Sequence, residues 1–251
     1  MHLIIDIGNT NIVFAIYKKR NIVDKWRIAT IVNRTSDEYL FWLKEIIKSN
    51  YSIENIIIGS VVPDIIMQIQ EACKIGFKKE VFIINDNLKI NFPSEVENAN
   101  EVGADRIVNA LFAWQTYKSA SIIIDFGTAT TFDVVNNNGV YKGGVICPGI
   151  NLSLKALYSA AAKLPRITVS KPENVIGNNT IKAMSSGIYW GYVSLIKGVV
   201  EKIKAEIEQD VILLATGGLS DFFSKEVSSE IIVNKDLTIH GLYLAFKNYR
   251  E

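Results

Sequence analysis

The feature that most constrains this sequence is a motif that occurs twice. An apolar run that ends in Asp-x-Gly and continues into small hydroxyl and amide residues occupies residues 3–11 and again residues 122–131. After each motif the chain resumes as a β-prone segment, at 12–17 and at 132–135, so each copy predicts a β-hairpin. A single copy is common at the turn of an ordinary β-hairpin. Two copies at the head of two similarly sized halves predict a two-copy architecture.

The rest of the chain alternates between helical and strand-like patterns in both halves. A hairpin-led sheet followed by such alternation, occurring twice, predicts an α/β fold with mixed sheets. We place the joint between Trp114 and Ser121, which gives domains at residues 1–116 and 117–251. The expected helices span 37–49, 64–75, 104–117, 151–163, 180–207, 221–226 and 237–249, and the expected further strands span 55–62, 81–84, 211–215 and 231–233.

Composition excludes several classes of partner. The 251 residues carry a formal net charge of +1 with the charges interspersed, so no overall field indicates nucleic acid or an anionic membrane as partner. The N-terminus runs directly into a strand-like segment without the features of a signal peptide. No apolar run is long enough to span a bilayer. We therefore expect a soluble cytoplasmic protein.

The few cysteines and histidines exclude further chemistry. Cys73 and Cys147 lie far apart and form neither a metal-binding spacing nor a disulfide framework. His2 and His240 are the only histidines. A chain with two histidines and no C-x-x-C motif is not a zinc enzyme of the usual kind, and it offers little for Ser-His or Cys-His catalysis.

The two turns have the composition of a phosphate site. Gly8–Asn11 and Gly127–Thr131 supply backbone N–H donors and small residues that permit close approach. Neither turn matches a P-loop or a Rossmann fingerprint. Asp6 and Asp125 repel phosphate directly, so carboxylates beside a phosphate chain imply an intervening cation, usually magnesium. If both turns face one cleft, they clamp a metal–ATP complex from two sides.

A third element is the tetrad Gly103-Ala104-Asp105-Arg106 at the start of an expected helix. Asp105 can accept a hydrogen bond from a hydroxyl nucleophile and orient it. Arg106 has the planar fork that suits a substrate carboxylate. From spacing alone, a capped helix start with a surface ion pair is the simpler interpretation. In the same way, Gly217-Gly218 fits either a close backbone approach to a nucleotide or a tight strand-to-helix turn.

Taken together, these residues resemble the type III pantothenate kinase family. The resemblance covers essentially the whole chain in order. It is carried by Asp6-Ile7-Gly8-Asn9-Thr10-Asn11, Gly103-Ala104-Asp105-Arg106, Asp125-Phe126-Gly127-Thr128-Ala129-Thr130-Thr131, Gly143-Gly144, Pro148-Gly149, Leu164-Pro165, Gly177-Asn178-Asn179-Thr180 and Thr216-Gly217-Gly218-Leu219.

The resemblance implies a fold, a reaction and a set of partners. The fold is that of the acetate and sugar kinase/Hsp70/actin superfamily: two ribonuclease-H-like (actin-like ATPase) domains with mixed sheets flanked by helices and an ATP cleft between them. The reaction is ATP-dependent phosphorylation of pantothenate to 4'-phosphopantothenate, the first step of coenzyme A biosynthesis. The resemblance also implies a homodimer, Mg²⁺ and a monovalent cation, K⁺ or NH₄⁺.

The resemblance also implies residue roles, carried over motif by motif. Asp105 is the proton acceptor. Asp125 binds the monovalent cation, and Asp6 serves the ATP phosphates together with magnesium. The remaining expected contacts are Asp6, Ile7, Gly8, Asn9, Thr10, Asn11, Ile12, Val13 and Thr128 to ATP, and Gly103, Ala104, Asp105, Arg106 and Thr180 to pantothenate, with Arg106 near its carboxylate and Thr180 reaching it from the partner subunit.

The chain departs from the family pattern in one place. Val96 and Ala99 stand where many members have a Tyr and a Pro ahead of the tetrad. Two other functions remain open at this point. One is a kinase of the same fold acting on another small hydroxy metabolite, and the other is a non-catalytic nucleotide-binding regulator. The retained trio Asp6, Asp105 and Asp125 argues against the regulator, because a pure binder has little use for three carboxylates.

Overall fold

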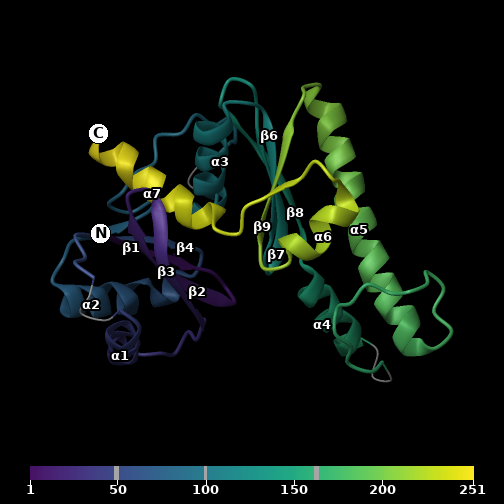
Figure 1. Cartoon of the computed structure of the whole chain (residues 1–251), viewed down its shortest axis with the longest axis horizontal. Helices are drawn as coiled ribbons and strands as arrows, with labels where there is room; N and C mark the ends of the chain where they lie inside the picture. Colours follow the sequence, from purple (N-terminus) through teal and green to yellow (C-terminus); the bar gives the residue numbers. More distant parts are fainter. Residues whose placement is uncertain (48–50, 99–100, 161–163) are drawn as a thin grey trace. The chain divides into compact units, whose positions relative to one another are not determined.

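The chain forms two compact units. The computed structural model describes residues 1–47, 51–98, 101–160 and 164–251. Unit 1 comprises Met1–Thr116 together with Asp236–Glu251, and unit 2 comprises Tyr117–Lys235 (Figure 1). Each unit is built around one five-stranded mixed sheet.

Unit 1 has the strand order β3-β2-β1-β4-β5. β1 pairs antiparallel with β2 and parallel with β4, β2 pairs antiparallel with β3, and β4 pairs parallel with β5. β1 and β4 are apolar on both faces, as expected for strands in the middle of a covered sheet. The strands are β1 (His2–Ile7), β2 (Asn11–Lys18), β3 (Asn21–Ala29), β4 (Asn55–Ser60) and β5 (Val81–Ile83).

Helices cover both faces of this sheet. The side chains of Leu3 and Ile5 pack with α1 (Ser36–Ile46) and α2 (Ile66–Phe77), which follows a short 3-10 helix at Pro63–Ile65. On the opposite face, Ile4 and its neighbours pack with α3 (Ala104–Tyr117) and α7 (Leu237–Arg250). Asp6 follows Ile4 by two residues and therefore lies on the α3/α7 face.

Unit 2 repeats this topology strand for strand. Its order is β10-β9-β6-β7-β8, so β6 takes the place of β1, the β7–β8 meander that of β2–β3, and β9 and β10 those of β4 and β5. The duplication inferred from the two motifs is therefore confirmed in the sheets. The strands are β6 (Ser121–Phe126), β7 (Ala129–Val135), β8 (Tyr141–Pro148), β9 (Ile212–Gly217) and β10 (Ile232–Val233).

The helices of unit 2 are α4 (Ile150–Ala160), α5 (Thr180–Ile207) and α6 (Ser220–Val227). α5 and α6 pack on the face of the sheet that carries Ile122 and Ile124. Tyr189 and Tyr192 of α5 are buried in this cluster, so these aromatic side chains belong to the core of unit 2. Thr130 and Tyr192 hydrogen-bond through their hydroxyls, which ties α5 to the start of β7.

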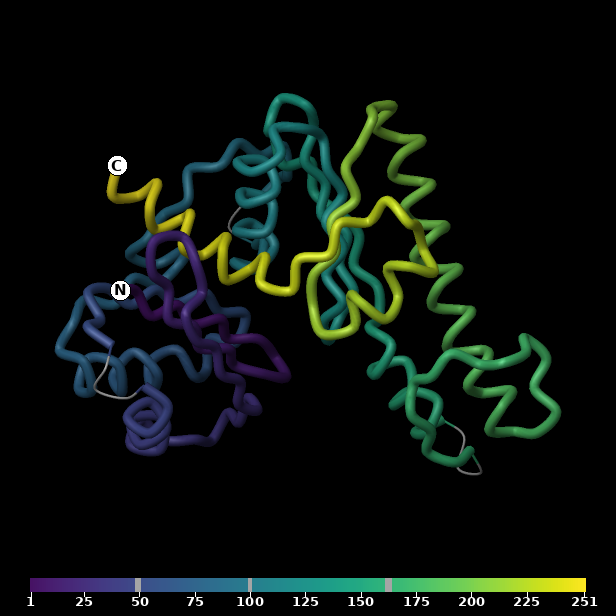
Figure 2. The backbone as a smooth tube through the Cα atoms, in the orientation of Figure 1, coloured from purple at the N-terminus to yellow at the C-terminus, as the bar shows by residue number. Residues whose placement is uncertain are grey.

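The last helix departs from the predicted domain division. The sequence placed residues 237–249 in the second domain, 117–251, whereas α7 packs on β1 and β4 of unit 1. Its apolar side, with Leu242 and Phe246 buried, completes the second core of that unit. Figure 2 shows α7, in yellow, running beside the purple N-terminal strands. The helices predicted at 37–49 and 151–163 reach residues outside the described ranges.

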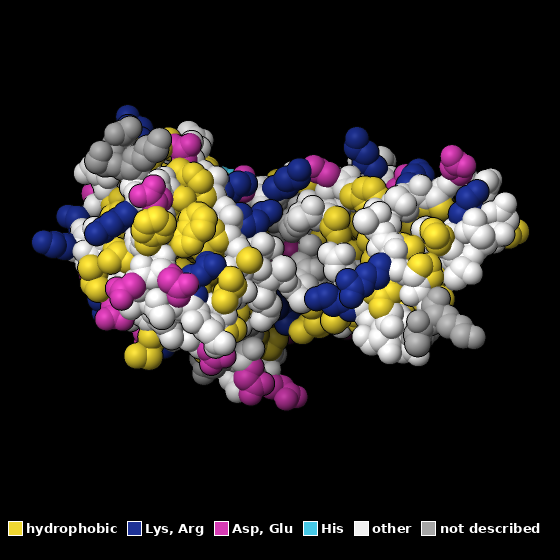
Figure 3. Space-filling view, turned by 90° about the horizontal axis from the view of Figure 1, so that it is seen from below, with side chains coloured by type: hydrophobic (Ala, Val, Ile, Leu, Met, Phe, Trp, Pro, Cys, Tyr) yellow, Lys and Arg dark blue, Asp and Glu magenta, His cyan; other side chains and the backbone are white. Residues whose placement is uncertain are grey.

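The outer surface carries charges of both signs. Figure 3 shows Lys and Arg side chains interspersed with Asp and Glu over the visible face, in line with the net charge of +1. Within the described part of the chain, no helix is both long enough and apolar enough to cross a bilayer.

Candidate active site

The first site element is the turn that follows β1. Asp6 is the penultimate residue of the strand, and the N–H of Gly8 donates to the carbonyl of Asn11 over 3.0 Å to close the turn. A Cβ at Gly8 would approach that same carbonyl to 3.2 Å, so the tight closure favours glycine. Asn9 and Thr10 are exposed at the tip, where backbone donors are accessible to an anion.

The end of β3 supports this turn from outside, which the sequence motifs did not reveal. The Thr30 hydroxyl donates to the carbonyl of Gly8 over 2.6 Å, and the Thr30 N–H donates to the carbonyl of Thr10 over 3.0 Å. Both turn carbonyls are thereby directed toward β3. Thr30 fixes the conformation of the turn and is a positioning residue.

The second element is the start of α3. Asp105 lies in the first turn of the helix, where the helix dipole favours an anion. Its Oδ1 accepts a hydrogen bond of 2.8 Å from the N–H of Arg106. A Cβ on Gly103 would lie 2.6 Å from this oxygen, closer than real contacts allow. The glycine of the tetrad therefore leaves room for the carboxylate to fold back over the helix start.

Within unit 1 the Asp105 carboxylate acts electrostatically on Asp6. Burial and, second, the Asp105 carboxylate raise the pKa of Asp6 to about 7, while Arg27 acts in the opposite direction. Burial also raises the pKa of Asp105, against the hydrogen bond and the charge of Arg106. Two desolvated carboxylates of like charge are more stable with a cation between them or beside them. The pair therefore fits a divalent cation such as Mg²⁺, which prefers carboxylate oxygen.

The third element, in unit 2, is the turn after β6. The N–H of Gly127 donates to the carbonyl of Ala129 over 3.1 Å, which parallels the closure at Gly8. Gly217 has φ +89, and a Cβ there would lie 2.6 Å from Oδ1 of Asp125. Gly217 thus allows the turn after β9 to close against Asp125. This supports the tight-turn interpretation and places that turn beside a site carboxylate.

Two threonines flank Asp125 in the sheet. The strand register pairs Asp125 with Thr131 of β7 and with Thr216 of β9, so the three side chains share one face. Hydroxyl and carboxylate oxygens are hard donors. This row fits an oxygen-coordinated monovalent cation. Nearby, the N–H of Gly149 donates to the carbonyl of Thr128 over 3.2 Å, which holds the tip of the turn.

Thr180 lies away from Asp125 within its own unit. It opens α5, whose N-cap residue Asn179 accepts a hydrogen bond from the N–H of Lys182 over 2.9 Å. Tyr192, which contacts Thr130, is twelve residues further along α5, or about 18 Å of helix. Thr180 instead lines a cavity of 740 Å³ together with Leu157, Leu164, Gly177, Asn178, Met184 and Ile188.

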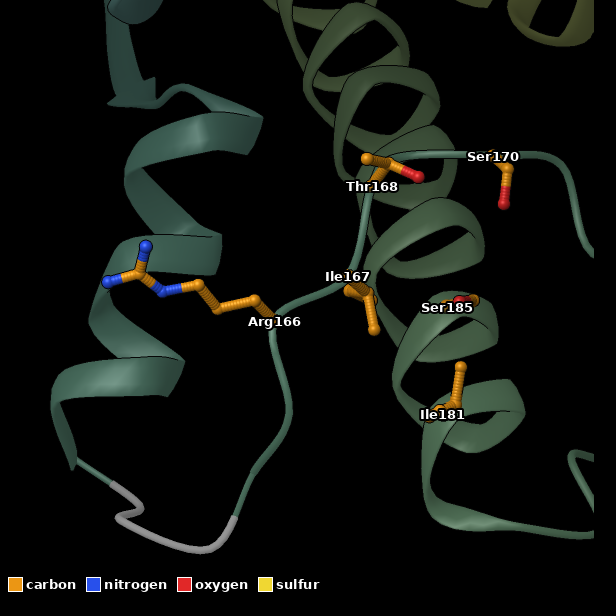
Figure 4. A pocket seen from close by; sticks show the side chains of 6 residues that line it. All are labelled: Arg166, Ile167, Thr168, Ser170, Ile181 and Ser185. Atoms are coloured by element: carbon orange, nitrogen blue, oxygen red, sulfur yellow. The ribbon is translucent and has the colours of Figure 1, made fainter.

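A smaller pocket of 370 Å³ lies on the neighbouring side of α5. Figure 4 shows its lining: Arg166, Ile167, Thr168 and Ser170 come from the segment before α5, and Ile181 and Ser185 from the helix itself. None of the predicted site residues lines this pocket. Among the described residues no cluster of three or more His, Cys, Asp or Glu is arranged to hold a metal, so a metal ion bound here would need substrate oxygens as ligands besides single carboxylates.

Val96 and Ala99 are the two positions at which the sequence departs from the family pattern. Val96 is half-buried, and its N–H donates to the Ser94 hydroxyl over 3.3 Å. Ala99 lies outside the described residues.

Solved structures of other proteins share this fold. The chain matches a putative Baf family transcriptional activator from Campylobacter jejuni with a TM-score of 0.64 at 21% identity, covering 99% of this chain and 98% of that one. It matches a ROK family glucokinase from Streptomyces griseus with a TM-score of 0.55 at 12% identity, covering 99% of both chains. These likenesses show the fold, which is that of the actin-like ATPases, with two mixed five-stranded sheets.

Sequence comparison gives the particular family. Residues 2–202 match the profile of type III pantothenate kinase. The type III pantothenate kinase of Acidiphilium cryptum is 47% identical over 99% of this chain and 95% of its own length, and that of Halalkalibacterium halodurans is 42% identical over 98% and 99%. The chain belongs to the type III pantothenate kinase family.

Proposed function

We propose that this chain transfers the γ-phosphoryl group of ATP to the primary hydroxyl of pantothenate. The product is 4'-phosphopantothenate, and the reaction is the first step of coenzyme A biosynthesis. The observation that carries the proposal is the pairing of Asp6 and Asp105 on one face of unit 1, with the pKa of Asp6 raised to about 7. Two neighbouring buried carboxylates beside an anion-binding turn suit a magnesium-assisted phosphoryl transfer, which depends on positioning and charge neutralisation.

Asp105 is the proton acceptor in this proposal. The hydrogen bond from Arg106 and the space left by Gly103 hold its carboxylate in one orientation. A fixed carboxylate can accept a hydrogen bond from the pantothenate hydroxyl and take its proton as the phosphoryl group transfers. Gly103, Ala104 and Arg106 bind pantothenate at the same helix start, with the guanidinium of Arg106 at the substrate carboxylate.

Residues 6–13 and Thr128 bind ATP in this proposal. The N–H groups of the first turn bind phosphate oxygens, and Thr30 keeps that turn closed. Mg²⁺, when bound near Asp6, neutralises phosphate charge. Asp125, flanked by Thr131 and Thr216, binds the monovalent cation, K⁺ or NH₄⁺.

Thr180 completes the pantothenate site of a second copy in this proposal. Within unit 2, Thr180 lies about 18 Å along α5 from Tyr192, the residue that contacts Thr130. The proposed assembly is therefore a homodimer. An exposed Ile176 and Ile181 next to the 740 Å³ cavity give this end of α5 an apolar surface for such a contact.

The test is ADP release with and without pantothenate, K⁺ and Mg²⁺, on wild type and on Asp105→Asn. We expect pantothenate-dependent turnover in wild type and a loss of about 10²- to 10⁴-fold in Asp105→Asn, as for removal of a general base. Asp37→Asn is the matched control, because Asp37 is also an acidic residue in a first helical turn but is exposed.

Near-wild-type turnover of folded Asp105→Asn would contradict the role of Asp105. A panel of small hydroxy acids and sugars tests the substrate. Faster ADP release with another acceptor would identify that acceptor as the substrate in place of pantothenate. ATP binding without any acceptor-dependent ADP release would identify the protein as a regulator.

A further inference from the structure

An arginine that no motif singled out lies in register with Asp6. In the sheet of unit 1, Asp6 of β1 pairs with Val13 of β2, and Val13 pairs with Arg27 of β3. Directly paired residues point to the same face of a sheet. Neighbouring strands are about 4.8 Å apart, so the Cα atoms of Asp6 and Arg27 are about 10 Å apart with the small Val13 between them.

This row lies on the face that carries the proposed catalytic group. Val13 packs against the cluster that contains Ala104, the residue preceding Asp105. The charge of Arg27 lowers the pKa of Asp6, and the charge of Asp105 raises it, so both groups act on the same carboxylate. Asp6, Asp105 and Arg27 therefore form one electrostatic group at the side of the first turn.

Arg27 has the exposure of a ligand-binding group. Its side chain is exposed, and within the described part of the chain it forms no ion pair. Lys25, two residues earlier on the same face of β3, is paired with Asp236. Of these two cations on β3, Lys25 is neutralised by an ion pair, whereas the charge of Arg27 is available to bind an external anion.

The duplicated sheet lacks this arginine. In unit 2 the row that contains Asp125 continues through Thr131 to Ile146 of β8. Ile146 therefore occupies the position of Arg27, and threonine occupies the position of Val13. The two aspartates occupy equivalent positions in the two sheets, but only the row of residues that contains Asp6 ends in a cationic side chain.

We propose that Arg27 is a phosphate-binding residue of this site, and that its guanidinium contacts the terminal phosphates of ATP. The inference rests on the proposed kinase function. A guanidinium presents two parallel N–H donors to phosphate oxygens and keeps its charge at every working pH. Beside Asp6 and Asp105, it offsets the repulsion between two carboxylates and an incoming polyphosphate.

The experiment measures ATP and AMP binding by calorimetry at saturating Mg²⁺, and the Michaelis constants for ATP and pantothenate, in Arg27→Gln, Arg27→Lys and Lys25→Gln. For Arg27→Gln we expect ATP binding to weaken about 10- to 100-fold, as for one lost charge-assisted contact. AMP lacks the terminal phosphates, so its binding changes by less than about 2-fold, as does the pantothenate constant. Arg27→Lys keeps the charge without the fork and falls between wild type and Arg27→Gln.

Lys25→Gln is the matched control, since it removes the same charge from the same face of the same strand. It should bind ATP as wild type does. Equal ATP affinities in all the variants would overturn the proposal and leave Arg27 as an exposed charge that protects an edge strand. Equal losses for ATP and AMP would also overturn it.

Failure of the proposal for Arg27 can be distinguished from failure of the proposed kinase function. If wild type binds ATP but does not phosphorylate pantothenate, the proposed function fails while the comparison of ATP with AMP still decides the role of Arg27. Melting temperatures identify any variant that is misfolded, and Arg27→Lys then carries the comparison, because it preserves the charge and most of the side-chain volume.

Discussion

At the residue scale, neighbours in the strand register set what each aspartate can do. Asp6 and Asp125 occupy equivalent positions, each before a glycine-containing turn closed by a backbone hydrogen bond. The residues in register with them differ in kind. The row of Asp6 contains an aliphatic and a cationic side chain, whereas Asp125 lies between two hydroxyl-bearing side chains. The rows are Gly59–Asp6–Val13–Arg27 in unit 1 and Thr216–Asp125–Thr131–Ile146 in unit 2. The first suits a phosphate chain with a divalent ion, and the second a weakly bound monovalent ion.

Gly103→Ala tests the space that Asp105 needs. The added Cβ would lie 2.6 Å from Oδ1 of Asp105, so the carboxylate must rotate away from its hydrogen bond with Arg106. A displacement of about 1 Å in a catalytic group can cost about 10²-fold. We expect kcat to fall by at least about 10-fold, measured as pantothenate-dependent ADP release, with a cooperative unfolding transition retained.

Gly198→Ala is the control for that substitution, because a Cβ at Gly198 meets nothing within 4 Å. It lies inside α5 and should stabilise the protein by up to about 1 kcal/mol with unchanged kcat. Unchanged kcat in Gly103→Ala would show that Asp105 does not depend on this space.

At the element scale, α7 is held on unit 1 by polar and aromatic contacts as well as by its apolar side. The Tyr17 hydroxyl and Nδ1 of His240 are 2.7 Å apart, and the His240 ring stacks on Phe112 of α3 with centroids 5.5 Å apart. Leu242 packs so closely over Gly59 that a Cβ there would lie 2.5 Å from its Cδ2. α7 therefore joins β2, β4 and α3 through a few specific contacts.

The attachment of α7 should weaken in acid. Burial lowers the pKa of His240 below its ordinary value of 6.5, with Asp236 opposing and Lys25 reinforcing that shift. The unfolded chain then binds the proton more readily, so the stability from neutral His240 is fully present above pH 6.5 and is lost as the pH falls through 6.5 toward the folded pKa. We expect the melting temperature of wild type to drop between pH 7.5 and pH 5.0, and to drop less in His240→Gln.

His2 is the reference for that measurement, because burial lowers its pKa as well and its ring contacts Tyr243 and Phe246 of the same helix. Equal drops in wild type, His240→Gln and the double variant with His2→Gln would show that neither ring titrates against the stability of unit 1.

The sequence predicted elements best where the pattern was local. The hairpins that begin at Asp6 and Asp125, the helix from Ala104 and the long helix from Thr180 are all present, because periodicity and turn residues specify them. The edge strands β3 and β8 were not predicted. β3 alternates half-buried and exposed residues, several of them charged, and such a segment becomes a strand only through pairing with its neighbour.

The site residues also divide into those that local sequence motifs predict and those that they do not. Asp6, Asp105 and Asp125 follow from motifs, since glycine and small residues beside each carboxylate are visible in the sequence. Thr30 and Arg27 do not, because their contribution comes from strand register, which sets which residues of distant strands meet. The unit that α7 joins was likewise not predictable, since an apolar helix face shows that it is buried but not against what.

At the scale of the whole molecule, unit 1 is discontinuous in sequence and unit 2 is continuous. The chain leaves unit 1 after Thr116 and returns at Asp236, with unit 2 inserted between. The returning segment supplies buried residues to the second core of unit 1: Ile239, Leu242, Ala245 and Phe246. Unit 1 therefore lacks part of its core until both segments are present.

Deletion of residues 236–251 tests this dependence. Burial of one large apolar side chain is worth about 1.5–3 kcal/mol, so losing several is comparable with the whole stability of a domain, about 5–15 kcal/mol. We expect unit 1 to lose cooperative unfolding and to be cleaved rapidly in limited proteolysis, while Tyr117–Lys235 resists.

The milder variant Leu242→Ala should keep the fold and lose about 2–5 kcal/mol. A truncated protein that unfolds cooperatively at the wild-type temperature would show that α7 is dispensable to unit 1.

The inserted order of the units also bears on how the protein is made. Domains commonly fold as units during synthesis, with the N-terminal one first. Here the first strands leave the ribosome before the helix that covers one face of their sheet, since all of unit 2 is synthesised between them. Unit 2 is therefore synthesised in full before α7, and the unit that carries Asp6 and Asp105 becomes complete only after unit 2 has been made.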